Sequence, residues 1–88
     1  MLDITKDAQK FIEKLPPKQS KQIIMSIFKL SNNPFPNDYK HLSGHPNCYR
    51  IDCGEYRICY KVFEKDVFII VIGIRNDDDV YKKIERKI

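Results

Sequence analysis

The chain has 88 residues, of which 42% are hydrophobic and 32% charged, and its formal net charge is +4. This length supports one domain with a modest core, and the composition is that of an ordinary globular protein. No stretch of about 18 apolar residues is present, which excludes a membrane-spanning helix, and the polar first residues do not resemble a secretory signal.

The first third of the chain predicts a short strand followed by two helices. Residues 1–4 suit a brief edge strand, and Thr5 is a suitable N-cap for a helix that ends at Pro16-Pro17. One face of this helix carries Ala8, Phe11, Ile12 and Leu15. A second helix is expected from about Lys18 to Leu30, and its buried side is assigned to Ile23, Ile24, Ile27, Phe28 and Leu30.

Residues 31–47 are expected to form a loop, and residues 48–75 are expected to form three strands. The two turns fall at Gly54-Glu55 and at residues 64–66, between runs rich in Val, Ile, Tyr and Phe. Alternation along each strand separates an apolar set from a polar set. The apolar set is Tyr49, Ile51, Tyr56, Ile58, Tyr60, Val62, Phe68, Ile70, Ile72 and Ile74. The third strand is apolar on both faces, so its second face must also be partly covered.

A last helix is predicted after residues 76–79, where Asn76 and three aspartates suit a helix start. Val80, Ile84 and Ile88 would lie on one side of it. The element order is therefore β-α-α-β-β-β-α, which is an α+β fold in a single domain that spans residues 1–88.

The three cysteines, Cys48, Cys53 and Cys59, are expected to be free thiols in a reducing, cytoplasmic compartment. Alternation places Cys53 on the opposite face of the sheet from Cys48 and Cys59. This separation also argues against a zinc site built from these cysteines with His41 or His45.

Three arginines fall on the polar face of the predicted sheet, together with Asp52. If the apolar faces coincide, Arg50, Arg57 and Arg75 gather there and could clamp a phosphate through paired hydrogen bonds. The alternative is a solvated face on which these charges pair with Asp52 and Glu55. Tyr81 could stack on a base, or it could pack the last helix onto the sheet.

These segments together resemble the RelE/ParE toxin superfamily. The similarity lies in Leu42-Ser43-Gly44-His45-Pro46 with Tyr49-Arg50-Ile51, in Tyr56-Arg57-Ile58-Cys59-Tyr60, and in Arg75 followed by Val80-Tyr81. The resemblance covers essentially the whole chain. It implies a small, twisted, mainly antiparallel sheet with two N-terminal helices on one face and a short C-terminal helix.

The resemblance also implies a function, namely that of a toxin that enters the ribosomal A site and cuts mRNA without a metal or cofactor. The 2′-OH of the substrate attacks the adjacent phosphate, which gives a 2′,3′-cyclic phosphate. By this resemblance Arg57 would stabilise the charge on the phosphate, Arg75 would assist the leaving oxygen, and Tyr81 would position the nucleotide. Arg50 would hold the RNA backbone, and Lys61 and Lys40 are assigned to substrate binding with it.

Two positions depart from the family pattern and leave alternatives open. Asp52 stands where members often carry lysine, and it is either a general base or a neutraliser of nearby arginines. Ile74 stands where relatives often carry a polar residue. The rival functions are a ParE-like poison of DNA gyrase and a decayed toxin that acts only as an antitoxin-binding co-repressor. The expected partners are a cognate antitoxin, the ribosome and mRNA, with DNA reached only through an antitoxin complex and no membrane partner.

Overall fold

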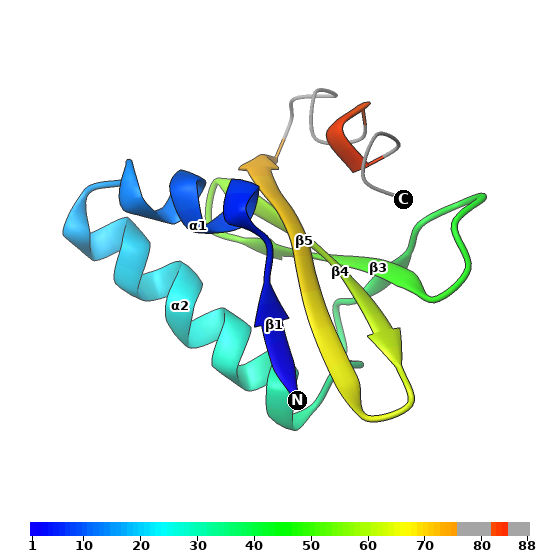
Figure 1. Cartoon of the computed structure of the whole chain (residues 1–88). Coiled ribbons are helices and arrows are strands. Elements are labelled where there is room, and N and C mark those ends of the chain that lie inside the picture. Colours follow the sequence, from blue (N-terminus) through cyan, green and yellow to red (C-terminus); the bar gives the residue numbers. More distant parts are fainter. Residues whose placement is uncertain (76–81, 85–88) are drawn as a thin grey trace.

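Five strands form one twisted sheet in the order β1-β5-β4-β3-β2 (Figure 1). The structure, a computed structural model, describes residues 1–75 and 82–84. β1 runs parallel to β5, and the other neighbouring strands are antiparallel. The elements are β1 (Leu2–Ile4), α1 (Lys6–Glu13), α2 (Pro17–Asn32), β2 (Lys40–His41), β3 (Cys48–Cys53), β4 (Tyr56–Phe63) and β5 (Asp66–Ile74).

The predicted α+β order is confirmed, with one addition. The two-residue strand β2 lies within the segment that was expected to be a loop, and it pairs with β3 through Lys40 and His41. Residues 82–84 are helical. The remainder of the predicted last helix, including its acidic start, lies outside the described residues.

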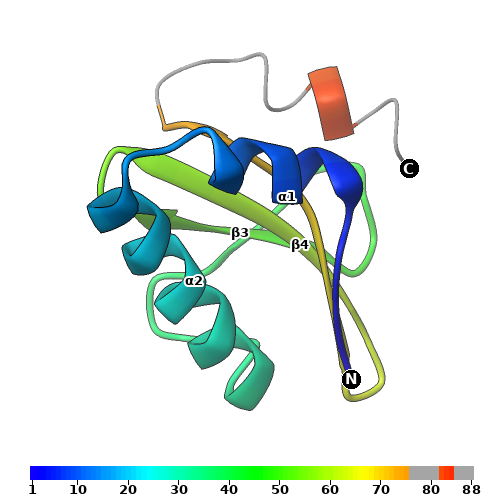
Figure 2. The ribbon, with the colours of Figure 1, turned by 60° about the vertical axis from the view of Figure 1, so that its left-hand side comes forward.

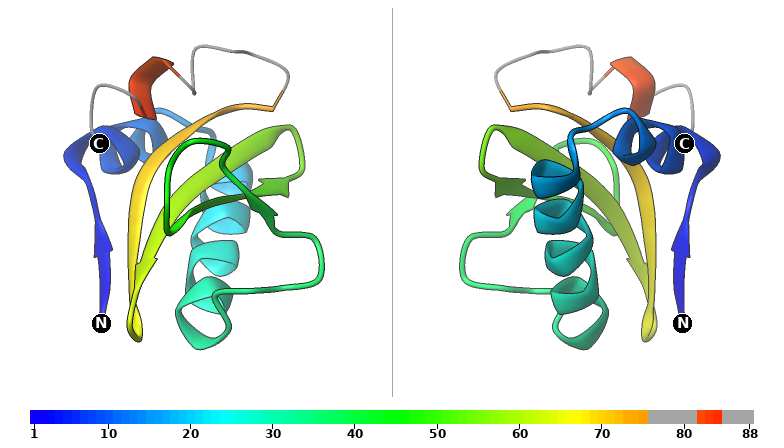
Figure 3. Two further views of the ribbon diagram at one scale, coloured as in Figure 1. Left: turned by 90° about the vertical axis from the view of Figure 1, so that its right-hand side faces the viewer. Right: turned by 90° about the vertical axis from the view of Figure 1, so that its left-hand side faces the viewer.

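Helices α1 and α2 cover one face of the sheet, which we call the helix face (Figures 2 and 3). Thr5 is the N-cap of α1, since its hydroxyl oxygen accepts a hydrogen bond from the backbone N–H of Ala8 at 3.2 Å. The apolar side of α1 packs on the sheet as predicted, with Ala8 fully buried and Phe11 in edge-to-face contact with Tyr56.

The predicted buried side of α2 is only partly correct. Ile23, Ile27 and Leu30 are buried, but Ile24 and Phe28 remain 38% and 58% exposed. The contact of α2 with the sheet is narrower than the apolar stripe in its sequence, because one helix presents only about a third of its surface to a flat neighbour. None of the helices in the described part of the chain is long and apolar enough to cross a membrane.

The opposite face of the sheet, which we call the outer face, has a smaller apolar cluster of its own. Leu42, from the loop after β2, and Ile84 cover the middle of this face. They pack against Cys48, Cys59, Ile70 and Val71. The prediction that the second face of β5 is partly covered is therefore confirmed.

An irregularity in β5 reverses part of the predicted alternation. Tyr60 pairs with Ile69 while the preceding Cys59 pairs with Val71, so Ile70 is an extra residue without a cross-strand partner. The hydroxyl of Thr5 donates a hydrogen bond to the carbonyl oxygen of Ile70, so the carbonyl group of this bulged residue has a hydrogen-bond partner.

The assignment of Phe68 and Ile70 to the same face as Ile72 was therefore wrong. Phe68 lies opposite Lys61, and Ile70 packs in the outer-face cluster. Beyond the bulge the predicted alternation holds, and Arg75 is on the outer face as expected.

Candidate functional site

The centre of the candidate site is an ion pair between two neighbouring strands. Asp52 on β3 lies directly opposite Arg57 on β4. The Nε–H group of Arg57 donates a hydrogen bond to Oδ1 of Asp52 at 2.9 Å. The side chain of Arg57 is only 14% exposed, whereas that of Asp52 is 38% exposed. The arginine is therefore held in place by its surroundings, and the carboxylate faces solvent.

Arg75 approaches the same carboxylate from the end of β5. Its Nε atom lies 4.0 Å from Oδ2 of Asp52, and its side chain is 49% exposed. Its backbone N–H donates a hydrogen bond to the carbonyl oxygen of Glu55 at 2.9 Å, which ties the end of β5 to the β3–β4 turn. The residue of β5 that lies opposite Arg57 is Gly73, which has no side chain. Two guanidinium groups thus converge on one carboxylate.

Arg50 and Lys40 extend this basic site across the sheet. Arg50 lies opposite Cys59 on β4 and opposite Lys40 on β2. Burial raises the pKa of the Cys59 thiol to about 12, although the charges of Arg57 and Arg50 partly oppose this effect. Both arginines therefore lie close to Cys59 on the outer face, on which the sequence placed them.

Lys61 shares the outer face with the arginines but lies away from Arg57. It follows Arg57 by four residues on β4, which corresponds to roughly 13 Å along the strand. It lines a shallow hollow with Phe63 and Phe68 near the β4–β5 turn. Cys59 lies between Lys61 and Arg57 along β4, whereas Lys61 is a diagonal neighbour of Arg50 across the β3–β4 pair.

Tyr81, the predicted stacking residue, lies outside the described residues. Ile74, next to Arg75, is 54% exposed and lies on the helix-face side of β5, opposite Tyr56. The outer face at Arg75 is therefore formed without the side chain of Ile74.

The cysteines occupy both sides of the sheet, as alternation predicted. Cys53 belongs to the helix-face core, where its Sγ lies 3.1 Å from Oγ of Ser26, while Cys48 and Cys59 are in the outer-face cluster. All three are free and buried. Within residues 1–75 and 82–84, no three His, Cys, Asp or Glu side chains are grouped so that they could hold a metal ion.

A second feature of the surface was not expected from the sequence. Five rings from the loop before β2 and from strands β2, β3 and β4 contact one another at the edge of the sheet. They belong to Phe35, Tyr39, His41, Tyr49 and Tyr60. The signal for this cluster was present, since Phe35 and Tyr39 are the two aromatic residues in an otherwise polar, proline-rich loop.

Comparison with known proteins identifies the family of this chain. The family described as "ParE toxin of type II toxin-antitoxin system, parDE" matches residues 2–81. A Methanocaldococcus jannaschii protein named as the toxin RelE1 is 33% identical over 84 residues, which cover 92% of this chain and 93% of that protein.

Solved structures of RelE toxins share the fold. The free Escherichia coli RelE toxin with two arginine-to-alanine substitutions superimposes with a TM-score of 0.81 and 27% identity, covering 100% of this chain and 97% of that chain. The toxin of the intact E. coli RelBE toxin–antitoxin complex gives a TM-score of 0.74 and 28% identity, over 88% and 98% of the two chains. The chain therefore belongs to the RelE/ParE superfamily of toxins of type II toxin–antitoxin systems.

Proposed function

We propose that this toxin is an endoribonuclease that cuts mRNA in the ribosomal A site. The observation that carries the proposal is the convergence of Arg57 and Arg75 on the carboxylate of Asp52. Two guanidinium groups that hold one carboxylate on an exposed face have the spacing and charge to hold one phosphate diester. An open surface of this kind also suits a polymer better than a small molecule.

In the proposed reaction the arginines stabilise charge, and the RNA supplies the nucleophile. The 2′-oxygen forms a bond to phosphorus as its proton passes to solvent water, and the bond from phosphorus to the 5′-oxygen breaks. Arg57, which is nearly buried and fixed, stabilises the charge on the non-bridging oxygens. Arg75, which is more exposed, donates a hydrogen bond to the departing 5′-oxygen, which then takes up a proton. Removal of one such donor typically lowers the rate by about 10²–10³.

Arginine itself is a poor base because its pKa stays above about 12. Asp52 carries a carboxylate beside both arginines, but its Oδ1 atom is already engaged by Arg57. We propose that Asp52 neutralises the arginines in the free toxin, and that an incoming phosphate replaces it. Arg50 and Lys40 would contact neighbouring phosphates, and Lys61 would contact a more distant part of the RNA. Tyr81 would position the nucleotide.

The partner that controls this activity is proposed to be a cognate antitoxin. Solved relatives include the intact E. coli RelBE complex and the M. jannaschii RelB–RelE complex. An acidic or amphipathic antitoxin segment over the outer face would cover the arginines and block access of RNA. Expression of the toxin alone is then expected to arrest growth, and coexpression of the antitoxin should relieve the arrest.

A second candidate function is poisoning of DNA gyrase, which the description of the matching family as ParE toxins favours. Addition of the purified protein to a translation extract, followed by primer extension on the mRNA, separates the two. The nuclease gives new mRNA ends at A-site codons and leaves gyrase supercoiling unchanged. Inhibited supercoiling with intact mRNA would instead support the gyrase function. If the protein neither cuts mRNA nor inhibits supercoiling, it is a decayed toxin.

A further inference from the structure

A pocket at the edge of the sheet adjoins the candidate site. Its walls come from α2, from the loop before β2 and from β3, and its volume is about 300 Å³. Asp52 is one of the residues that line it. The carboxylate of Asp52 is also bound by Arg57 and approached by Arg75. The pocket therefore borders the position at which the proposed function places a phosphate.

The pocket combines apolar walls with a few charged groups. Leu30 on α2 and Ile51 on β3 are buried and line it, and so do the exposed residues Lys29 and Asp38. Within the described residues, neither Lys29 nor Asp38 takes part in an ion pair. Ligand pockets commonly have volumes of about 300–1,000 Å³ and mainly apolar walls with a small number of polar groups. This pocket is at the small end of that range, which suits a single flat ring system such as a nucleobase.

The backbone of Asp52 offers a donor and an acceptor on the pocket side of β3. The backbone N–H of Leu42, just after β2, donates a hydrogen bond to the carbonyl oxygen of Cys48 at 2.9 Å. Bonded residues alternate along an antiparallel strand, so the N–H and C=O groups of Cys48 and Asp52 point toward the same side, which is the side of β2. However, β2 begins at Lys40, opposite Arg50, so it does not extend to Asp52. The two backbone groups of Asp52 are therefore directed toward the pocket.

The order of the strands indicates which nucleotide adjoins the pocket. Arg75 is at the end of β5, Arg57 is on β4 and Asp52 is on β3, and the pocket lies beyond β3. In the proposed reaction Arg75 assists the departing 5′-oxygen. The attacking and leaving oxygens lie on opposite sides of the phosphorus, so the attacking 2′-oxygen is on the β3 side. The nucleotide that carries this 2′-OH is therefore the one nearest to the pocket.

We propose that the pocket binds the base on the 5′ side of the cut, in the nucleotide whose 2′-OH attacks, and that this base carries an amino group. This inference rests on the proposed function and adds a base-specific contact to it. The arginines hold the phosphate on the outer face, while the base enters the pocket at the edge of the sheet. The ribose is then fixed between these two contacts, which orients its 2′-OH toward the phosphorus.

The acceptors of the pocket favour a base with an amino group. The carboxylate of Asp38 can only accept hydrogen bonds, and so can the carbonyl oxygen of Asp52. The amino groups of adenine and cytosine donate to such acceptors, and the backbone N–H of Asp52 donates to the ring nitrogen next to the amino group. Uracil has a carbonyl oxygen in place of the amino group, and the carboxylate repels it. We therefore expect adenine or cytosine, rather than uracil, before the cut.

The test uses ribosomes programmed with three messages that differ only in the base before the cut. The first carries adenine, the second carries unsubstituted purine, which lacks the amino group, and the third carries no base at this position. For the wild-type toxin we expect kcat/KM to be on the order of tenfold lower with purine than with adenine, because one hydrogen bond to a charged group is lost. The message without the base should be cleaved more slowly still.

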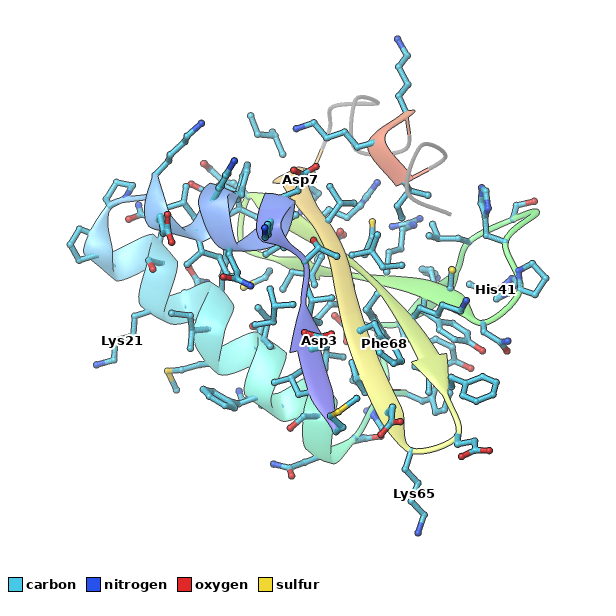
Figure 4. The ribbon with its side chains drawn as sticks, viewed as in Figure 1. Asp3, Asp7, Lys21, His41, Lys65 and Phe68 are labelled. Carbon is cyan, nitrogen blue, oxygen red and sulfur yellow. The ribbon has the colours of Figure 1, made fainter. Side chains whose placement is uncertain are left out.

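Substitution of Asp38 tests whether the pocket supplies this contact. Asp38→Ala removes the carboxylate, so the variant should cleave the adenine and purine messages at similar rates. Asp38→Asn keeps an acceptor oxygen and should keep part of the difference. Asp3→Ala is the matched control, because Asp3 is also exposed but lies on β1, at the opposite edge of the sheet (Figure 4). This control should retain the full wild-type difference between the messages.

The possible results are distinguishable. If the wild-type toxin cleaves the purine message as fast as the adenine message, the proposed base contact is wrong while the proposed function stands. If Asp38→Ala keeps the tenfold preference for adenine, or is slower on all three messages by the same factor, the amino group binds elsewhere and the proposal is also wrong. Unchanged cleavage by Asp38→Ala together with weakened antitoxin binding would assign the pocket to the antitoxin instead. If the wild-type toxin cleaves none of the messages, the proposed function fails, and this inference fails with it.

Discussion

Asp52 and Arg57 face each other across the β3–β4 pair, and a hydrogen bond of 2.9 Å joins their side chains. The carboxylate of Asp52 therefore occupies the position at which the proposed function needs a substrate phosphate. Because Arg75 also approaches this carboxylate, one acidic side chain balances two basic ones in the free toxin. This relationship makes the role of Asp52 testable by substitution.

Asp52→Asn removes the negative charge while it keeps the size of the side chain. If Asp52 is a neutraliser, the variant should bind RNA more tightly and cleave at least as fast as wild type, because the arginines no longer share their charge with it. If Asp52 is the general base, cleavage should instead fall by about 100-fold or more. Single-turnover cleavage of ribosome-bound mRNA distinguishes the two roles. A large fall in rate with unchanged ribosome binding would contradict the neutraliser role.

Replacement of Arg75 by Ala should abolish toxicity without a change in melting temperature. Its side chain is half exposed, and its contact with Asp52 is long, so it contributes little to stability. The expected loss in cleavage rate is about 10²–10³. Lys65→Ala, at the exposed β4–β5 turn (Figure 4), is the matched control and should remain toxic. Full toxicity of Arg75→Ala would exclude this residue from the site.

Arg57 needs a more conservative substitution, because its side chain is mostly buried. Arg57→Lys keeps a positive charge and most of the apolar stem, but it loses the two-pronged guanidinium group. We expect a folded protein whose cleavage rate falls by about 10²–10³. Circular dichroism would confirm the fold, and the translation extract would give the rate. Wild-type activity of this variant would show that paired hydrogen bonds from Arg57 are not needed.

Much of this site was predictable from the sequence, since strand alternation alone placed Arg50, Asp52, Arg57 and Arg75 on one face. Alternation could not predict the bulge at Ile70, because an extra residue changes the face of its neighbours without a sequence signature. The exposure of Phe28 was missed for a related reason, since helical spacing gives the direction of an apolar stripe but not the width of its contact. The cluster of five aromatic rings at the edge of the sheet depends on contacts between a loop and three strands, which local patterns do not contain.

The buried thiol of Cys59 predicts a specific dependence of stability on alkaline pH. Burial raises the pKa of this thiol from an ordinary value of 9.0 to about 12, so the unfolded chain loses the proton first as the pH rises. The stabilising contribution is therefore complete below pH 9 and is lost as the pH rises from 9 to about 12. Wild type should lose more unfolding free energy between pH 8 and pH 10.5 than Cys59→Val, which cannot ionise there. Equal losses in chemical denaturation would contradict this account.

The hydrogen bond from Tyr60 to Pro34 should make a measurable contribution to stability. Tyr60→Phe removes the hydroxyl and leaves the carbonyl oxygen of Pro34 without this partner. We expect the free energy of unfolding to fall by about 1–3 kcal/mol, as measured by chemical denaturation. Tyr56→Phe is the control, and a change of about 0.5 kcal/mol or less is expected there. Equal effects of the two variants would mean that the bond to Pro34 does not stabilise the loop.

The most direct test of the central claim is a measurement of how cleavage depends on the 2′-OH of the message. Ribosomes are programmed with an mRNA that carries either ribose or a single 2′-deoxyribose at the nucleotide before the cut, and the purified toxin is added. The proposed reaction predicts a 2′,3′-cyclic phosphate and a 5′-OH from the ribose message, and no cleavage of the deoxy message. Cleavage of the deoxy message at the same site would contradict attack by the 2′-OH, and an intact ribose message would contradict the nuclease function itself.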